Sequence, residues 1–181
     1  MNTTIAAISK SLTAAMKVLQ GDLREELAAQ GHTLTGKLRD SIQYEIEEGT
    51  DSVKATVECE DYGLALEFGV AANRIPYTPG SGSGGTSQYI QGLITFFEKR
   101  GLQGREAIGA AFATARVQKR EGMPTVGSYR FSSNGQRKGF ASTTLERDLN
   151  IIGNILEQQT GAFLQISLAE NIKMDSFEIY V

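Results

Sequence analysis

The chain has 181 residues, of which 40% are hydrophobic and 22% charged, as in ordinary globular domains, and this composition argues against wholesale disorder. The formal net charge of −3 argues against tight non-specific binding to nucleic acid, because such binding needs Lys and Arg to neutralise phosphates. No apolar run approaches the roughly 20 residues that cross a bilayer, and the N-terminus lacks a signal-peptide pattern. The single cysteine, Cys59, excludes an internal disulfide framework. We therefore expect a soluble protein that is made inside a cell and has no membrane partner.

The first predicted element is a long amphipathic helix that ends at Gly31. Apolar residues recur every three or four positions from Ile5 to Leu27, which places them on one face. Gly31 can adopt the left-handed backbone conformation that ends many helices. We expect the apolar stripe to pack on a sheet or on a neighbouring subunit.

A Gly-containing turn is expected next, within residues 35–42 (TGKLRDSI), and the first strand is expected to start immediately after it. We predict that Gly36 and Gly69 hold backbone conformations that a side chain would oppose. Leu38, Ile42 and Phe68 are predicted to be structural anchors around these turns.

A β-hairpin follows the turn, and its register can be predicted from the alternation of apolar and polar residues. A loop at 49–52 pairs Ile46 with Ala55, Tyr44 with Val57, Ile42 with Cys59 and, on the outer face, Glu47 with Lys54. This register keeps all the apolar residues on one face, whereas a slip by one residue would reverse a whole strand.

The rest of the chain predicts helices and long loops. Residues 62–69 fit either a helix or a strand, and a long loop at 70–86 contains a Gly/Ser run that is typical of a flexible linker. Two helices, a polar second loop at 123–139 and a long helix from about 145 come next. Residues 161–175 fit either a helix or a strand, and a strand is expected at 176–181.

These elements predict an α+β fold: a small antiparallel sheet with a long N-terminal helix, two central helices and a long C-terminal helix. We expect one domain over residues 1–181, and leave open whether 161–181 form a C-terminal extension.

The sequence gives little support for an enzyme. The chain has one His and one Cys, and we expect His32 to be an ordinary polar residue after a helix and Cys59 to fill space inside the hairpin. The glycines at 80–85 lack the Lys of a phosphate-binding loop. No set of residues predicts a catalytic, metal or cofactor site.

Two charged sets have more than one interpretation. Glu45, Glu47, Glu58 and Glu60 are predicted to point outward from the hairpin, either as a solvated face or as a surface that faces a DNA channel in a ring of subunits. The basic residues Arg116, Arg130 and Arg137 lie near the second loop, which is expected to become ordered only when a neighbour supplies contacts. They fit a solvated or partner-facing patch better than a nucleic-acid site.

The order of several short motifs resembles the tail-completion, or head–tail connector, proteins of the neck of long-tailed bacteriophages. The matching segments are 35–42 (TGKLRDSI), 67–69 (EFG), 75–79 (IPYTP), 111–116 (AFATAR) and 121–124 (EGMP). They follow an amphipathic helix and precede a long C-terminal helix, so the resemblance covers most of residues 1–160.

The resemblance implies a non-enzymatic virion protein without a cofactor, assembled in the host cytoplasm. Such proteins form rings, commonly hexameric, that join the capsid portal to the tail tube and contact neighbouring neck, connector and tail proteins. DNA passes through the channel without sequence-specific contact. The subunit or partner interface would then include Arg74, Ile75, Pro76, Tyr77, Arg116, Arg130 and Arg137.

A hypothesis from another class is a small soluble binding protein. It would use the basic region 116–138 to bind nucleic acid or an acidic partner.

Overall fold

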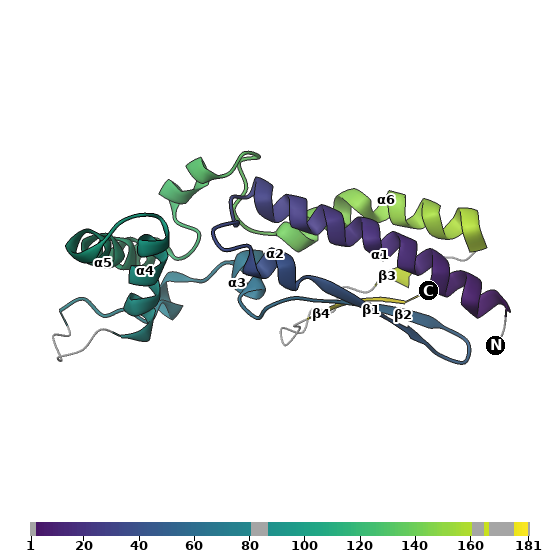
Figure 1. The fold of residues 1–181 in the computed structure, drawn as a ribbon. Coiled ribbons are helices and arrows are strands. Elements are labelled where there is room, and N and C mark those ends of the chain that lie inside the picture. Colours follow the sequence, from purple (N-terminus) through teal and green to yellow (C-terminus); the bar gives the residue numbers. More distant parts are fainter. Residues whose placement is uncertain (1–2, 81–86, 161–164, 167–175, 181) are drawn as a thin grey trace.

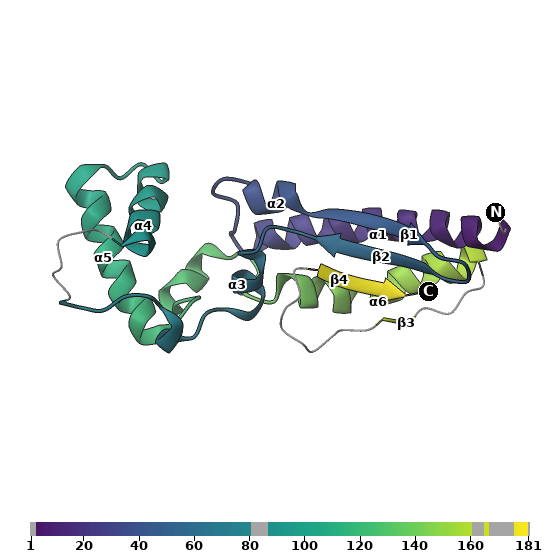
Figure 2. The same ribbon diagram turned by 90° about the horizontal axis from the view of Figure 1, so that it is seen from below.

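The structure is a computed structural model that describes residues 3–80, 87–160, 165–166 and 176–180. It confirms the predicted α+β fold. A body contains the sheet and the two longest helices, and a pair of shorter helices lies at one end of it (Figures 1 and 2). Residues 81–86 of the predicted linker, and most of 161–181, lie outside the described residues.

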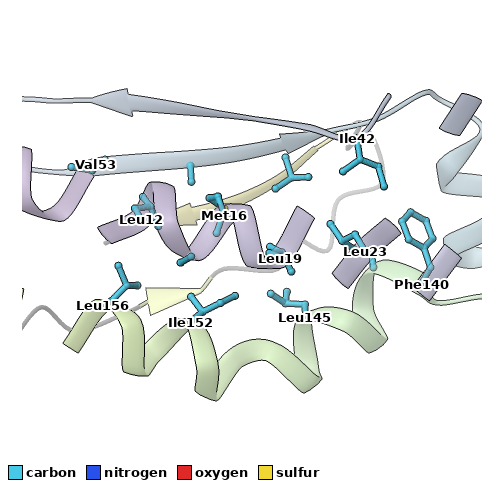
Figure 3. Packing of buried hydrophobic residues seen from close by; sticks show 14 of the residues in the cluster. Leu12, Met16, Leu19, Leu23, Ile42, Val53, Phe140, Leu145, Ile152 and Leu156 are labelled. Carbon is cyan, nitrogen blue, oxygen red and sulfur yellow. The ribbon is translucent and has the colours of Figure 1, made fainter. Parts of the chain in front are cut away.

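The body is organised around α1 (Thr3–Ala29), which matches the predicted N-terminal helix. Its apolar stripe contacts α6 (Phe140–Thr160) and both hairpin strands in a single hydrophobic cluster (Figure 3). Leu12, Met16 and Leu27 from α1 are fully buried there. Gly31 has the expected left-handed φ of +75° after the helix.

The hairpin comprises β1 (Gln43–Glu48) and β2 (Val53–Glu58), which are antiparallel. The predicted pairs Tyr44–Val57, Ile46–Ala55 and Glu47–Lys54 are confirmed. The hairpin lies on the long helix through its apolar face, as the alternation required.

The predicted direct passage from the turn into the first strand is wrong. A short helix, α2 (Lys37–Ser41), follows Gly36, and Ile42 caps its C-terminus, so Ile42 does not pair with Cys59 in the ladder. The Ser41 hydroxyl donates to the carbonyl of Leu38 and accepts from the amide of Glu60, which ties this helix to the end of β2. Such local hydrogen bonds favour one helical turn over an extended start.

The sheet continues through β4 (Ser176–Tyr180), which pairs with β2, and β3 (Gln165–Ile166), which pairs with β4. The strand order is β1-β2-β4-β3, so the predicted C-terminal strand lies beside the hairpin. The ambiguous segment after the hairpin is helical, as α3 (Gly63–Phe68).

The two central helices, α4 (Gln88–Lys99) and α5 (Gly104–Glu121), form a helical hairpin with its own small core. Ser87 caps α4 by accepting the amide of Ile90 at 3.3 Å. The small residues Ala107, Ala111 and Ala115 are fully buried, which lets the two helices approach closely. The loops that connect this hairpin to the body contain the short 3₁₀ helices η1 (Ala72–Arg74) and η2 (Val126–Phe131).

We predict that Gly36→Val destabilises the chain. Gly36 has a φ of +69°, and the left-handed region costs an L-residue roughly 1–2 kcal/mol. Thermal or urea unfolding should therefore show a loss of at least about 1 kcal/mol. Gly21→Ala is the control, because Gly21 lies within α1 with open space around its Cα and should gain up to about 1 kcal/mol. A Gly36→Val protein that unfolds like the wild type would contradict this role of the glycine.

Candidate interaction surface

His32 and Cys59, the two residues considered for nucleophilic chemistry, both have structural roles in the fold. His32 donates from Nε2 to the carbonyl of Arg137 at 3.2 Å, and Cys59 packs against the main core. In the described ranges, His, Cys, Asp and Glu side chains do not gather in a group of three that could hold a metal ion. No described helix is long and apolar enough to cross a bilayer.

A buried polar seam between α1 and α6 is occupied by an ion-pair network. The Arg147 guanidinium lies 3.0 Å from Asp148 Oδ1 and 3.6 Å from Glu26 Oε2. Burial, together with a hydrogen bond to Asp148, raises the pKa of the Asp22 carboxyl. The Arg147 guanidinium therefore joins α6 to α1 through Glu26, while the second Asp148 oxygen, Oδ2, is buried without a hydrogen-bond partner among the described residues.

The motif at 67–69 connects α3 to the start of α6. The Glu67 carboxylate is 8% exposed and accepts the backbone amides of Ala141 at 2.8 Å and Ser142 at 3.2 Å. A carboxylate at this position satisfies unpaired amides and complements the helix dipole. Sequence reasoning missed this cap, although a single acidic residue in a short apolar segment was a signal for it.

The glycine of the same motif lies where the two long loops cross. Val70 and Met123 exchange two backbone hydrogen bonds of 2.8 Å. Gly69 and Gly122 flank this bridge with φ of +75° and +83°, and a Cβ on either would lie 2.5 Å from the carbonyl oxygen of the opposite loop. Only glycine fits this approach, so the crossing fixes Val70 of the first loop against Met123 at the start of the second.

Phe68 lies between Glu67, which caps α6, and Gly69 of the loop crossing, yet its side chain is 67% exposed. The prediction that Phe68 is a structural anchor is therefore wrong, because α3 turns this ring away from the core. Leu38 and Ile42 do lie in the core, at 2% and 1% exposure.

The second loop is held by the C-terminal end of α1, which contradicts the expectation that it orders only against a neighbour. The amide of Ser133 donates to the Ala29 carbonyl at 2.8 Å, and Asn134 Nδ2 donates to Glu26 Oε1 at 2.8 Å. Gln30 Nε2 donates to the Lys138 carbonyl at 3.3 Å. These partners come from residues more than 100 positions apart, which a sequence pattern does not reveal.

Two residues of the predicted partner interface are used inside the chain instead. Ile75 is 2% exposed, and Lys119 Nζ donates to its carbonyl at 2.9 Å. The Arg137 guanidinium is half-buried and donates to the carbonyl of Gln30, and burial lowers its pKa. The Ile75 side chain is buried and cannot meet a partner, so that prediction is wrong, whereas the half-buried Arg137 keeps part of its surface exposed and its place in an interface stays a prediction.

The remaining predicted interface residues keep some exposure. Tyr77 is half-buried and packs edge-to-face on Phe112, with the ring centroids 6.5 Å apart. The exposed members are Arg74, Pro76, Arg116 and Arg130.

An exposed cluster of aromatic rings and guanidinium groups links the end of α4 to η2; we call Phe96, Arg100, Arg130 and Phe131 the stacked cluster. Arg100 lies over the rings of Phe96 and Phe131, at 4.7 and 5.3 Å from their centroids, and Arg130 lies 4.7 Å from that of Phe131. Such cation–π contacts orient the groups without burying them. Sequence reasoning missed Phe96 and Arg100 because only the fold brings α4 next to the second loop.

Beside the stacked cluster, η2 presents further apolar side chains to solvent. Val126 is 78% and Phe131 48% exposed. Tyr129 follows Val126 by three residues, so both lie on the same side of the 3₁₀ helix. Exposed apolar groups on a backbone fixed at both ends are typical of a binding surface.

The acidic residues of the hairpin point outward, as the alternation predicts. Glu45, Glu47 and Glu58 are exposed. Glu47 lies 4.0 Å from Lys54 Nζ, and Glu60 lies 2.9 Å from Lys37 Nζ. The face thus keeps an excess of negative charge after these pairs are counted.

No protein-family model, curated protein or solved structure matches this chain.

We predict that stability falls as the pH is lowered from about 6.5 to about 4, through His32. Burial and the nearby charge of Arg137 lower the pKa of His32 from 6.5 to about 4. Between these values the unfolded chain takes up a proton that the folded chain does not, so unfolding becomes easier. Thermal melting of wild type and His32→Gln across this range should show a shallower pH dependence for the variant. Parallel curves would show that His32 is not the titrating group.

Proposed function

We propose that this chain is a structural subunit of the bacteriophage neck. In this proposal several copies form a ring between the capsid portal and the tail tube and leave a channel for DNA. The order of the sequence motifs supports the assignment to the neck. The exposed apolar side chains on α3 and η2 support a role in contacts between proteins.

The observation that carries the proposal is the rigid presentation of exposed apolar side chains. Phe68 follows the carboxylate that caps α6, and Val126 and Phe131 lie on a loop that is bonded to the crossing and to α1. Exposed aromatic and aliphatic groups on an already ordered backbone lose little conformational freedom on binding. They are therefore suited to contact other subunits.

The motifs of the resemblance coincide with structural joints, which supports the comparison. The segment 35–42 contains the left-handed glycine and α2, which lead from the long helix to the hairpin. The segment 67–69 contains the α6 cap and one glycine of the loop crossing. Residues that set the relative positions of elements are those that a shared architecture would retain.

The alternative, a binding protein for nucleic acid, has one observation in its favour. Guanidinium groups stacked on exposed aromatic rings, as in the stacked cluster, also occur in proteins that bind single strands. This alternative requires DNA binding that weakens steeply with salt. A mobility shift at low ionic strength that disappears at high ionic strength would favour it, and no shift at low ionic strength would exclude it.

The direct test of the proposal is cryo-electron microscopy of particles from cells that produce this chain with its genomic neighbours. The proposal expects density for a ring of this chain between portal and tail tube. Particles that lack the chain, with all of it free in the lysate, would refute the neck assignment.

We predict that the double variant Val126→Ser/Phe131→Ser lowers the number of copies per particle. Loss of two apolar anchors at an interface costs about 1.4 kcal/mol or more, which is tenfold or more in occupancy when binding is not saturated. Quantitative mass spectrometry of purified particles measures this number. Leu149→Ser/Ile151→Ser, on the exposed side of α6, is the matched control and should leave it unchanged. If the Val126→Ser/Phe131→Ser protein enters particles in the same number of copies as the control variant, η2 is not part of the interface.

A further inference from the structure

The charges of this chain are segregated along the sequence. Residues 45–61 contain seven acidic residues and one basic residue, a net charge of −6. Residues 99–138 contain nine basic and two acidic residues, a net charge of +7. The small overall charge of −3 hides this separation.

The fold keeps the β1–β2 hairpin apart from α4 and α5, while the second loop lies against the end of α1. The β1–β2 hairpin extends toward the end of the molecule near the N-terminus, whereas α4 and α5 lie at the opposite end (Figures 1 and 2). Opposite charges at the two ends of an elongated subunit do not neutralise each other within one copy, so each end remains available to attract the opposite end of another copy.

The basic end has a well-defined exposed face on α5. Arg105, Ile108, Phe112 and Arg116 follow one another at helical spacing, and all four are exposed. Among the described residues, Arg105 and Arg116 have no ion-pair partner. The face therefore has two apolar side chains between two guanidinium groups, an arrangement suited to an acidic surface with some room for apolar contact.

The acidic end has a face of similar length. Glu45 and Glu47 of β1 and Glu58 of β2 lie on the outer side of the hairpin, and β1 is an edge strand of the sheet. Arg105 and Arg116 are separated by about 17 Å along a helix with a rise of 1.5 Å per residue. Glu47 and Glu58, which pairs with Gln43, lie four strand positions apart, about 14 Å at roughly 3.4 Å per residue.

We propose that the basic face of α5 in one copy docks on the acidic outer face of the β1–β2 hairpin in the next copy. This inference rests on the proposed assembly function and names the surface through which copies meet. The contact is heterologous, because it joins two different patches, and repeated contacts of this kind close into a ring when the rotation between copies allows it. Under this proposal the glutamates bind the next subunit instead of facing the DNA channel.

The test uses charge reversal on either side. Glu45→Lys/Glu47→Lys places two lysines on β1 opposite the two arginines of α5, and Arg105→Glu/Arg116→Glu places two glutamates on α5 opposite the two glutamates of β1, so neither variant should associate with itself. In a mixture, the lysines on β1 of the first variant can face the glutamates on α5 of the second. The unchanged glutamates on β1 of the second variant can likewise face the unchanged arginines on α5 of the first, so the mixture should associate. Lys10→Glu/Lys17→Glu, on the exposed side of α1, is the control for charge change alone.

Two measurements are made on the full chain. Sedimentation velocity of the purified proteins at low ionic strength reports association, and mass spectrometry of particles from cells producing each variant, or both, reports copies per particle. We expect each variant alone to lose association and incorporation at least tenfold, and the mixture to recover at least half. Circular dichroism melting verifies that each variant folds.

The outcomes separate this inference from the neck proposal. If each variant, produced alone, enters particles in the same number of copies as the wild type, the docking surface is overturned and the neck proposal stands. Loss in both variants without recovery in the mixture also overturns it, because the charges then matter for another reason. Recovery in the purified mixture, with the wild type absent from particles, supports the docking surface and refutes the neck assignment.

Discussion

The packing of the α1 stripe against α6 and the hairpin is the interaction on which the rest of the structure depends. Leu12, Met16 and Leu27 from α1 contribute to the same cluster as Val53 of the hairpin and Ile152 of α6. Each fully buried side chain of this size contributes about 1.5–3 kcal/mol. Because the partners of α1 include the hairpin and α6, this core is complete only when residues more than 100 positions apart meet.

A second layer of organisation comes from polar contacts at the ends of helices. The Glu67 cap determines where α6 starts, the Val70–Met123 bridge joins the two long loops, and the end of α1 binds the second loop. These contacts bury polar groups with partners, which avoids the cost of leaving them unsatisfied. They also tie the second loop, which carries exposed apolar side chains, to α1 and to Val70.

The distribution of burial supports the proposed role in assembly. The body and the α4–α5 pair each have a hydrophobic cluster, so the fold does not need the exposed apolar groups of η2 for its own core. The ionisable residues with perturbed pKa values, such as Asp22 and His32, are engaged by neighbouring groups of the chain. Exposed aromatic rings and guanidinium groups lie on α4, α5 and η2, and exposed carboxylates lie on the β1–β2 hairpin.

The sequence by itself determined the elements whose periodicity reflects a single buried face. The stripe of α1 and the hairpin register from Tyr44–Val57 to Glu47–Lys54 could both be predicted, because each depends on neighbours within one element or one turn. The acidic face followed from the same alternation. Only the tertiary structure decided the roles of Glu67, Ile75 and Arg137, whose partners lie 44 to 107 positions away. The stacked cluster belongs to this second class, since α4 and the second loop meet only once the chain has folded.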